Sequence, residues 1–150
     1  MIIYIGADHA GFELKKALIE HLKAVGNEVT DVGAETMEHD DDYPRYAYSL
    51  AVKVLGEENA DDAHGILICG SGQGMSIAAN RVRGIRAALA WSLESAANAR
   101  SDDNANVLVL PARYLEAADA TAAVDAWLSA TFNQDPKYQR RLDELEELYG

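Results

Sequence analysis

The sequence has 150 residues, a hydrophobic fraction of 49%, and 13 basic against 25 acidic residues, which gives a formal net charge of -12. This length suits one domain with its own core, so we expect a single domain over residues 1–150. The acidic surplus excludes nucleic acid and anionic membrane surfaces as partners, because both require a basic face. No apolar run is long enough to span a bilayer, so no transmembrane helix is expected.

Short apolar segments alternate with helical patterns from the start of the chain. The apolar segment 2–5 predicts a first strand and not a signal peptide, since no basic segment precedes it. Apolar residues at helical spacing then run over 12–25 and stop at a glycine. A short second strand is expected at 29–32. After a polar stretch, Pro44 opens a helix that extends to residue 55.

The second half of the chain continues this alternation. We expect strands at 65–69, 85–90 and 107–110, and helices from residue 75 and at 93–99, 117–128 and 136–149. The order and the continuous apolar strands predict an α/β fold of three α-β-α layers, in which helices cover both faces of a mostly parallel five-stranded sheet. The last helix lies beyond the last strand, so it either packs on its own domain or reaches a partner. Ligands of such sheets bind at the carboxyl ends of the strands.

A glycine-rich loop, Cys69-Gly70-Ser71-Gly72-Gln73-Gly74, follows the clearest strand. Glycines at alternate positions allow backbone N–H groups to point into one concavity, which suits a phosphate or an enediolate. A thiol beside a helix N-terminus ionises more readily than a free cysteine, so Cys69 is a candidate base for removing a proton next to a carbonyl. The alternative is a buried cysteine at the end of an apolar strand, and the loop alone leaves both interpretations open.

Further polar residues fall near the expected ligand edge. Asp8 and His9 follow the first strand and can hold hydroxyls and an anion, although Asp8 can equally serve as a helix cap. Arg113 follows the last strand, where it could meet a phosphate. Lys137 and Arg141 are four residues apart on one helix face and form a candidate phosphate clamp, with a solvated face as the alternative.

The residues show no metal-ligand spacing, so we expect no metal site. The four histidines are scattered, and the single cysteine has no partner for a disulfide. The run Asp40-Asp41-Asp42 is interpreted as an exposed acidic loop and not as a cation site. The Gly-x-Gly-x-Gly spacing of the loop after Cys69 matches neither a dinucleotide fingerprint nor a P-loop.

Five segments of the sequence carry a resemblance to a known family. They are Gly-Ala-Asp-His-Ala-Gly at 6–11, Asp-Tyr-Pro at 42–44, the highly specific segment 65–80, Gly-Ile-Arg-Ala at 84–87 and Asn-Val-Leu at 106–108. In this order they resemble ribose-5-phosphate isomerase B and its galactose-6-phosphate isomerase relatives over essentially the whole chain. The resemblance implies a cytoplasmic, Rossmann-like enzyme that interconverts a phosphorylated aldose and ketose through a cis-enediol, without cofactor or metal. It also implies a homodimer with active sites shared across the interface; whether dimers pair further stays open.

By position, the resemblance implies roles for individual residues. Cys69 matches the base that moves a proton between C1 and C2, and Ser71 stands where a threonine assists ring opening. Tyr43 lines the same pocket. The remaining matches are to substrate ligands: Asp8 for a hydroxyl, Gly70, Gly72 and Gly74 for the enediolate, and His9, Arg113, Lys137 and Arg141 for the phosphate.

One position departs from the family. Asp102 stands where a histidine donates a proton to the furanose ring oxygen, and Asp103, a further substrate contact, replaces an asparagine. An ordinary aspartate is ionised at neutral pH and donates a proton poorly. This departure leaves three alternatives, the first being that the enzyme opens ribose 5-phosphate slowly or with a protonated Asp102. The second is that it acts on a four-carbon aldose 4-phosphate, which cannot close a furanose. The third is that it borrows a histidine from a paralogous chain. A hexose 6-phosphate isomerase and a non-catalytic phosphosugar-binding subunit are the further alternatives.

Overall fold

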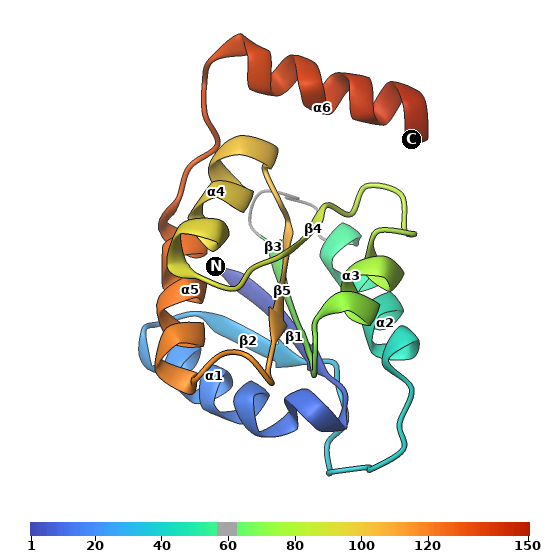
Figure 1. The fold of residues 1–150 in the computed structure, drawn as a ribbon, viewed down its shortest axis with the longest axis vertical. Helices are drawn as coiled ribbons and strands as arrows, with labels where there is room; N and C mark the ends of the chain where they lie inside the picture. The colour runs from blue at the N-terminus through green and yellow to red at the C-terminus, as the bar shows by residue number, and fades with distance from the viewer. Residues whose placement is uncertain (57–62) are drawn as a thin grey trace.

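The computed structural model describes residues 1–56 and 63–150 (Figure 1). Its strands form one sheet in the order β2-β1-β3-β5-β4, and each neighbouring pair is parallel. The strands are β1 (Ile2–Ala7), β2 (Glu28–Asp31), β3 (Ala63–Cys69), β4 (Ala87–Leu89) and β5 (Val107–Pro111). The predicted α/β fold with a five-stranded parallel sheet is therefore confirmed.

Helices cover both faces of this sheet. They are α1 (Phe12–Ala24), α2 (Tyr43–Leu55), α3 (Gln73–Ala79), α4 (Leu93–Asp103), α5 (Ala117–Ser129) and α6 (Pro136–Tyr149), with a short 3-10 turn, η1 (His9–Gly11), before α1. Among these described elements, no helix is both long and apolar enough to cross a bilayer.

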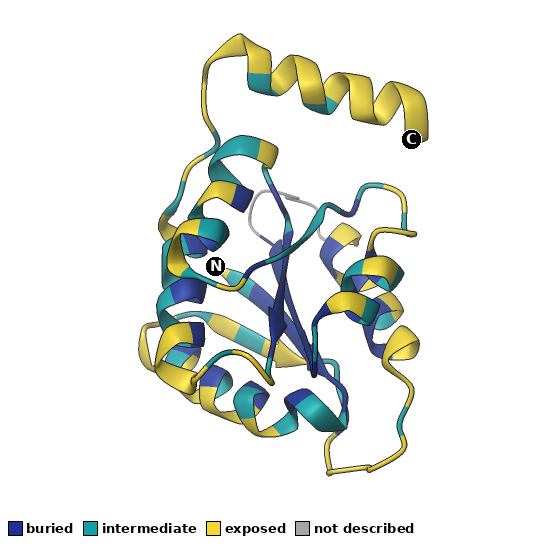
Figure 2. Cartoon of the chain, viewed as in Figure 1, coloured by how far each residue is buried: buried dark blue, intermediate teal, exposed yellow. Residues whose placement is uncertain are grey.

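The core is divided into two layers by the alternation of side chains along each strand. Leu108 and Leu110 of β5 pack toward α1, α4 and α5, in a cluster that includes Trp127. Val107 and Val109 of the same strand pack toward α2 and α3. Every residue of β3 and β5 is buried, as Figure 2 shows for the centre of the sheet. Burial on both faces explains why these strands are continuous apolar runs in the sequence.

The carboxyl ends of β1, β3 and β5 lie side by side, because these strands are neighbours in the sheet. Ala7 is paired with Ile68, and Cys69 with Pro111. The loops that follow these strands therefore meet at one edge, which we call the carboxyl edge. The opposite side of the sheet, where the strands begin, is the amino edge.

Helix α4 is longer than the predicted 93–99 segment and ends at Asp103. Asn104 has a φ of 47°, and the N–H groups of Asn104 and Ala105 donate to the carbonyls of Arg100 and Ala99. This arrangement is a Schellman motif, which ends a helix with a left-handed residue. It places Asp102 and Asp103 in the last turn of α4, immediately before β5 and therefore at the amino edge.

Helix α6 extends beyond the amino edge and has no buried residue (Figures 1 and 2). Between α6 and the β4 region lies a mainly apolar groove of about 640 Å³, whose lining includes Leu142, Leu145 and Tyr149. The helix contacts α4 of its own chain, so both alternatives for this helix stay predictions.

Candidate active site

A pocket of about 160 Å³ lies at the carboxyl edge, where the loops after β1, β3 and β5 meet the start of α2. It is lined by Asp8, His9, Ala10, Tyr43, Cys69, Gly70, Ser71, Gly74 and Arg113. All but one of these residues, Ala10, are candidates from the sequence. The pocket is smaller than the groove beside α6, but it holds Cys69 and most of the polar candidates, so we assign it as the candidate active site.

Cys69 is the last residue of β3, and only 5% of its surface is exposed. The backbone N–H of Gly72 donates to its Sγ at 3.2 Å. The burial at a strand end is therefore confirmed, and the role of Cys69 as a base stays a prediction. An N–H donor beside the sulfur is a contact that a thiolate accepts well.

Three glycines shape the loop in different ways. Gly72 has a φ of 76°, a left-handed conformation that other residues adopt only with strain. A Cβ atom at Gly70 would approach Cζ of Arg113 to 2.7 Å, and one at Gly74 would approach Cζ of Tyr43 to 2.6 Å. Gly70 and Gly74 thus give Arg113 and Tyr43 the space to line the pocket. Gly72 itself is buried behind the pocket and is not among its lining residues.

Backbone hydrogen bonds join the loop after β5 to the loop after β3. Ala112 N–H donates to the carbonyl of Cys69 at 2.9 Å, and Arg113 N–H donates to the carbonyl of Gly70 at 3.0 Å. These bonds extend the pairing of β3 and β5 past the ends of the strands. They hold Arg113 beside the cysteine.

Asp8 serves as a cap and also lines the pocket. Its Oδ1 accepts hydrogen bonds from the N–H groups of Ala10 and Gly11, at 3.0 and 3.3 Å. The capping alternative for Asp8 is therefore correct, although it does not exclude contact with a ligand. Burial raises the pKa of this carboxyl above its ordinary value, against the lowering effect of the Gly11 hydrogen bond.

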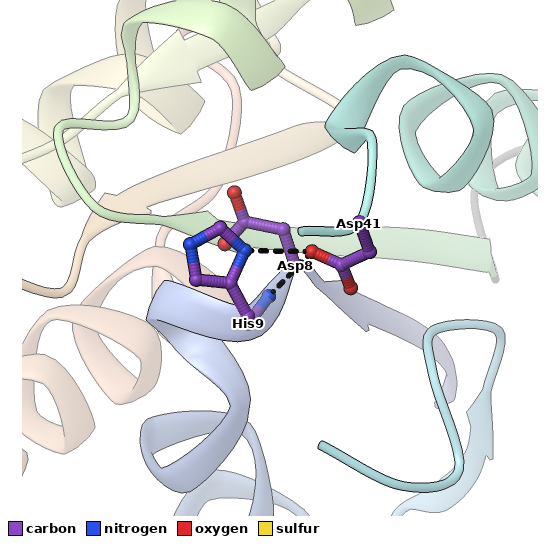
Figure 3. Close-up of side chains that lie close together, drawn as sticks. All are labelled: Asp8, His9 and Asp41. Carbon is purple, nitrogen blue, oxygen red and sulfur yellow. Dashed lines mark hydrogen bonds and ion pairs between the residues drawn. The ribbon is translucent and has the colours of Figure 1, made fainter. Parts of the chain in front are cut away.

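His9 is paired with Asp41, which comes from the loop before α2 (Figure 3). Nδ1 of His9 lies 2.7 Å from Oδ1 of Asp41, and the backbone N–H of His9 donates to the same oxygen at 3.0 Å. The hydrogen bond to this carboxylate raises the pKa of His9. Burial alone would raise the pKa of Asp41, but the hydrogen bonds from His9 and Tyr46 outweigh it and hold that pKa below its ordinary value.

The expectation of an exposed acidic loop is wrong for Asp41, since its side chain has 0% of its surface exposed. The physical reason is the pairing with His9, which lies 32 residues earlier in the chain. A run of three aspartates contains no signal for which one turns inward. Asp41 turns inward because the loop before α2 approaches the end of β1, where His9 lies.

Asp8, His9 and Asp41 each place one ligand atom within 4.8 Å of the others, the spacing that a metal ion would need. Two of these atoms, Nδ1 of His9 and Oδ1 of Asp41, are already bonded to each other. Oδ1 of Asp8 accepts the two backbone N–H groups of its turn. All three ligand atoms are therefore already engaged in hydrogen bonds within the protein.

Four of the candidate residues lie away from this pocket in the same chain. Asp102 and Asp103 end α4, while Lys137 and Arg141 belong to α6. β5 has five residues and separates the two edges by about 13 Å. Asp103 and Arg141 line the groove beside α6. One chain therefore does not bring these four residues together with Cys69.

Lys137 and Arg141 do share one face of α6, as their spacing predicts. Nζ of Lys137 lies 5.0 Å from the centre of the Tyr138 ring, and Cζ of Arg141 lies 5.6 Å from the same centre. Lys137 also pairs with Asp135 at 3.2 Å. At the end of α4, Ser101 Oγ donates to Oδ1 of Asp102 at 3.0 Å.

Comparison with known proteins places these features in a family. The family model described as ribose/galactose isomerase matches residues 3–145. Ribose-5-phosphate isomerase B of Mycobacterium tuberculosis (strain CDC 1551 / Oshkosh) is 44% identical over 147 residues, covering 98% of this chain and 89% of that protein. The structure of ribose-5-phosphate isomerase B from Mycoplasma genitalium with bound ribulose 5-phosphate has a TM-score of 0.93 at 43% identity, and the match covers 98% of this chain and 95% of that one. A ribose 5-phosphate isomerase from Thermotoga maritima has a TM-score of 0.90 at 45% identity, with 97% of each chain covered. The chain therefore belongs to the ribose/galactose isomerase family.

Proposed function

We propose that this chain is a pentose-phosphate isomerase that interconverts ribose 5-phosphate and ribulose 5-phosphate without a cofactor, with Cys69 as the base. The observation that carries the proposal is the composition of the pocket, where Cys69 lies with Asp8, His9 and Arg113. Sγ of Cys69 accepts a hydrogen bond from the N–H of Gly72 at 3.2 Å. The relative whose structure contains ribulose 5-phosphate supports the substrate class.

The proposed reaction moves one proton between adjacent carbons. The Cys69 thiolate takes the proton from C2 of the open-chain aldose, and the released electron pair forms the C1–C2 double bond while the C1 carbonyl oxygen becomes an oxyanion. N–H groups of the loop 70–74 stabilise this enediolate. After a proton passes from O2 to O1, the thiol returns its proton to C1 and the C2 ketone forms. A cytoplasmic location fits this base, because thiols stay reduced there.

The proposal includes a homodimer with shared active sites. The pocket supplies His9 and Arg113 for the phosphate, whereas Lys137 and Arg141 lie at the amino edge, beyond the reach of their own Cys69. In a dimer with twofold symmetry, the same two surfaces meet twice, so the amino edge of each chain can complete the carboxyl edge of the other. Helix α6, with no buried residue and an apolar groove beside it, has the surface that such a partner would cover.

A second substrate class is favoured by the surroundings of Asp102. Its Oδ1 accepts a hydrogen bond from Ser101, a contact that an ionised carboxylate accepts well, and an ionised carboxylate has no proton to give to a ring oxygen. A four-carbon aldose 4-phosphate needs no such donor, because its O4 is esterified and cannot close a furanose ring. The second candidate is therefore a tetrose 4-phosphate isomerase with the same base.

A coupled isomerase assay tests both candidates. Ribose 5-phosphate and erythrose 4-phosphate are compared with the wild type, Cys69→Ala and Asp102→His, and the fold of each variant is checked by circular dichroism. We expect turnover of at least one substrate by the wild type and a loss of about 10²-fold or more in kcat for Cys69→Ala.

The two substrates also separate the candidates. If ring opening limits the reaction, Asp102→His increases the rate on ribose 5-phosphate and leaves the rate on erythrose 4-phosphate unchanged. Wild-type rates at background on both substrates would reject the isomerase, and full activity of Cys69→Ala would reject the assigned base.

A further inference from the structure

We propose that Asp41 is a positioning residue that holds His9 as a cation aimed at the phosphate of the substrate. The identity of that substrate comes from the proposed function, on which the inference rests. Asp41 itself is not among the residues that line the pocket. Asp41 does not touch the ligand in this account. It acts through the imidazole of His9.

The contacts between the two residues leave one ring nitrogen for the pocket. Oδ1 of Asp41 accepts from both the ring Nδ1 and the backbone N–H of His9, at 2.7 and 3.0 Å. Two bonds to one oxygen restrict rotation of the ring (Figure 3). Nε2 lies on the opposite side of the imidazole, and His9 keeps 36% of its side-chain surface exposed at the pocket. A protonated ring therefore presents Nε2–H to a ligand.

Asp41 is itself held in place from α2. The hydroxyl of Tyr46, a buried residue of that helix, donates to Oδ2 of Asp41 at 3.1 Å. The same helix begins at Tyr43, which lines the pocket. Asp41 thus connects the turn after β1 to the start of α2, and its charge is fixed behind the imidazole.

The charges around His9 favour the imidazolium. Asp41, Asp8 and Asp40 are the carboxylates that act on it, and its neighbours in the pocket are Arg113, Tyr43 and Cys69. The hydrogen bond to Asp41 is the largest contribution to the raised pKa of His9. Because this pKa lies above the ordinary 6.5, the ring keeps its charge to a higher pH than a free histidine and loses it as pH rises through the raised value. A charged His9 attracts a phosphate dianion in a protein whose formal net charge is -12.

The test compares Asp41→Asn with a matched pair elsewhere in the chain. The amide oxygen of asparagine can still accept Nδ1–H, so this change removes mainly the charge. Asp125→Asn is the control, since Asp125 pairs with Nε2 of His21 at 2.8 Å and neither residue lines the pocket. KM and kcat for ribose 5-phosphate are measured from pH 5.5 to 8.5. The titration of the His9 ring is followed by NMR, with His9→Gln to assign its signal and inorganic phosphate as the binding probe.

We expect Asp41→Asn to lower the pKa of His9 and to raise KM about tenfold near pH 8, because a smaller fraction of the ring is then protonated. The effect shrinks below pH 6, where the ring is charged in both proteins, and kcat changes little. Asp125→Asn should match the wild type. The NMR titration needs no turnover, so a raised His9 pKa that falls in Asp41→Asn, with phosphate binding weakened, supports the inference even if the isomerase assay fails.

Two results would overturn it. One is a His9 pKa at or below 6.5 in the wild type, a measurement that does not depend on how well any variant folds. The other is an Asp41→Asn protein whose kcat and KM change equally at every pH, which is the pattern of a purely structural defect.

Discussion

Gly72 connects a backbone conformation to the chemistry of the pocket. Its φ of 76° turns the chain directly after Ser71, and in this conformation its N–H donates to Sγ of Cys69. A Cβ atom at this position would also collide with the side chain of Leu89. The glycine is therefore required both by the left-handed conformation and by the contact with β4.

The change Gly72→Ala should lower kcat/KM by about tenfold to a hundredfold, because it displaces the N–H that contacts the sulfur. It should also destabilise the fold, since an alanine at positive φ costs about 1–2 kcal/mol. Gly26→Ala is the matched control: Gly26 has a φ of 91°, but a Cβ there meets nothing within 4 Å. Thermal melts should show a loss of stability in both variants, and kinetics a loss of activity in Gly72→Ala alone. Equal activities would mean that the Gly72 N–H has no role in catalysis.

Helix α6 is stabilised locally and contributes no residue to the core. Oδ1 of Asp135 caps its first turn by accepting the N–H of Lys137 at 3.0 Å, and this hydrogen bond, with the ion pair to the same lysine, lowers the pKa of Asp135. A cation in the first turn of a helix opposes its dipole, so Lys137 is poorly placed for helix stability. Lys137 and Arg141 both lie close to the Tyr138 ring, and their proximity fits a role in binding an anion.

We therefore expect Lys137→Ala to raise KM for ribose 5-phosphate about tenfold, the loss of one charge-assisted contact to the phosphate, with a smaller effect on kcat. Arg140→Ala removes a neighbouring cation from the same helix turn and should leave KM within about twofold of the wild type. Steady-state kinetics at fixed ionic strength measures both values. If the two variants raise KM equally, the effect is one of overall charge and the clamp is not supported.

At the scale of the whole molecule, the residues of the proposed site are divided between opposite edges of one sheet. Cys69 and His9 lie at the carboxyl edge, and Arg141 lies in α6 beyond the amino edge. A chain of this shape cannot assemble the full set alone. The proposed twofold dimer resolves this division, because each of its two sites takes one edge from each chain.

Mixing two impaired variants, assayed at a substrate concentration below the wild-type KM, tests this arrangement. Cys69→Ala and Arg141→Ala are unfolded together and refolded, so that half of the dimers contain one chain of each kind. Each mixed dimer then has one site with both residues intact, and about a quarter of the wild-type activity should return. The control mixes Cys69→Ala with Asp8→Ala, whose residues share one pocket, and it should restore nothing. No recovery in the first mixture would show that Arg141 acts on its own chain or not at all.

Much of the fold could be predicted because the strands are buried on both faces. Val107 to Leu110 is a continuous apolar run, and the structure extends β5 only to Pro111. The end of α4 was less predictable. Asp102 and Asp103 continue the helix without any apolar pattern, and only the left-handed Asn104 ends it. Without that boundary, the sequence does not show that both aspartates lie at the amino edge.

The sequence by itself determined the order of elements and the parallel sheet, and it marked the glycine-rich loop after β3, because hydrophobic periodicity and glycine spacing are local signals. The tertiary structure decided which distant residues meet. It paired His9 with Asp41, which a run of three aspartates could not single out, and it separated Asp102 and Arg141 from Cys69. Such pairings depend on how loops meet across the sheet, and the short-range pattern of the sequence does not contain that information.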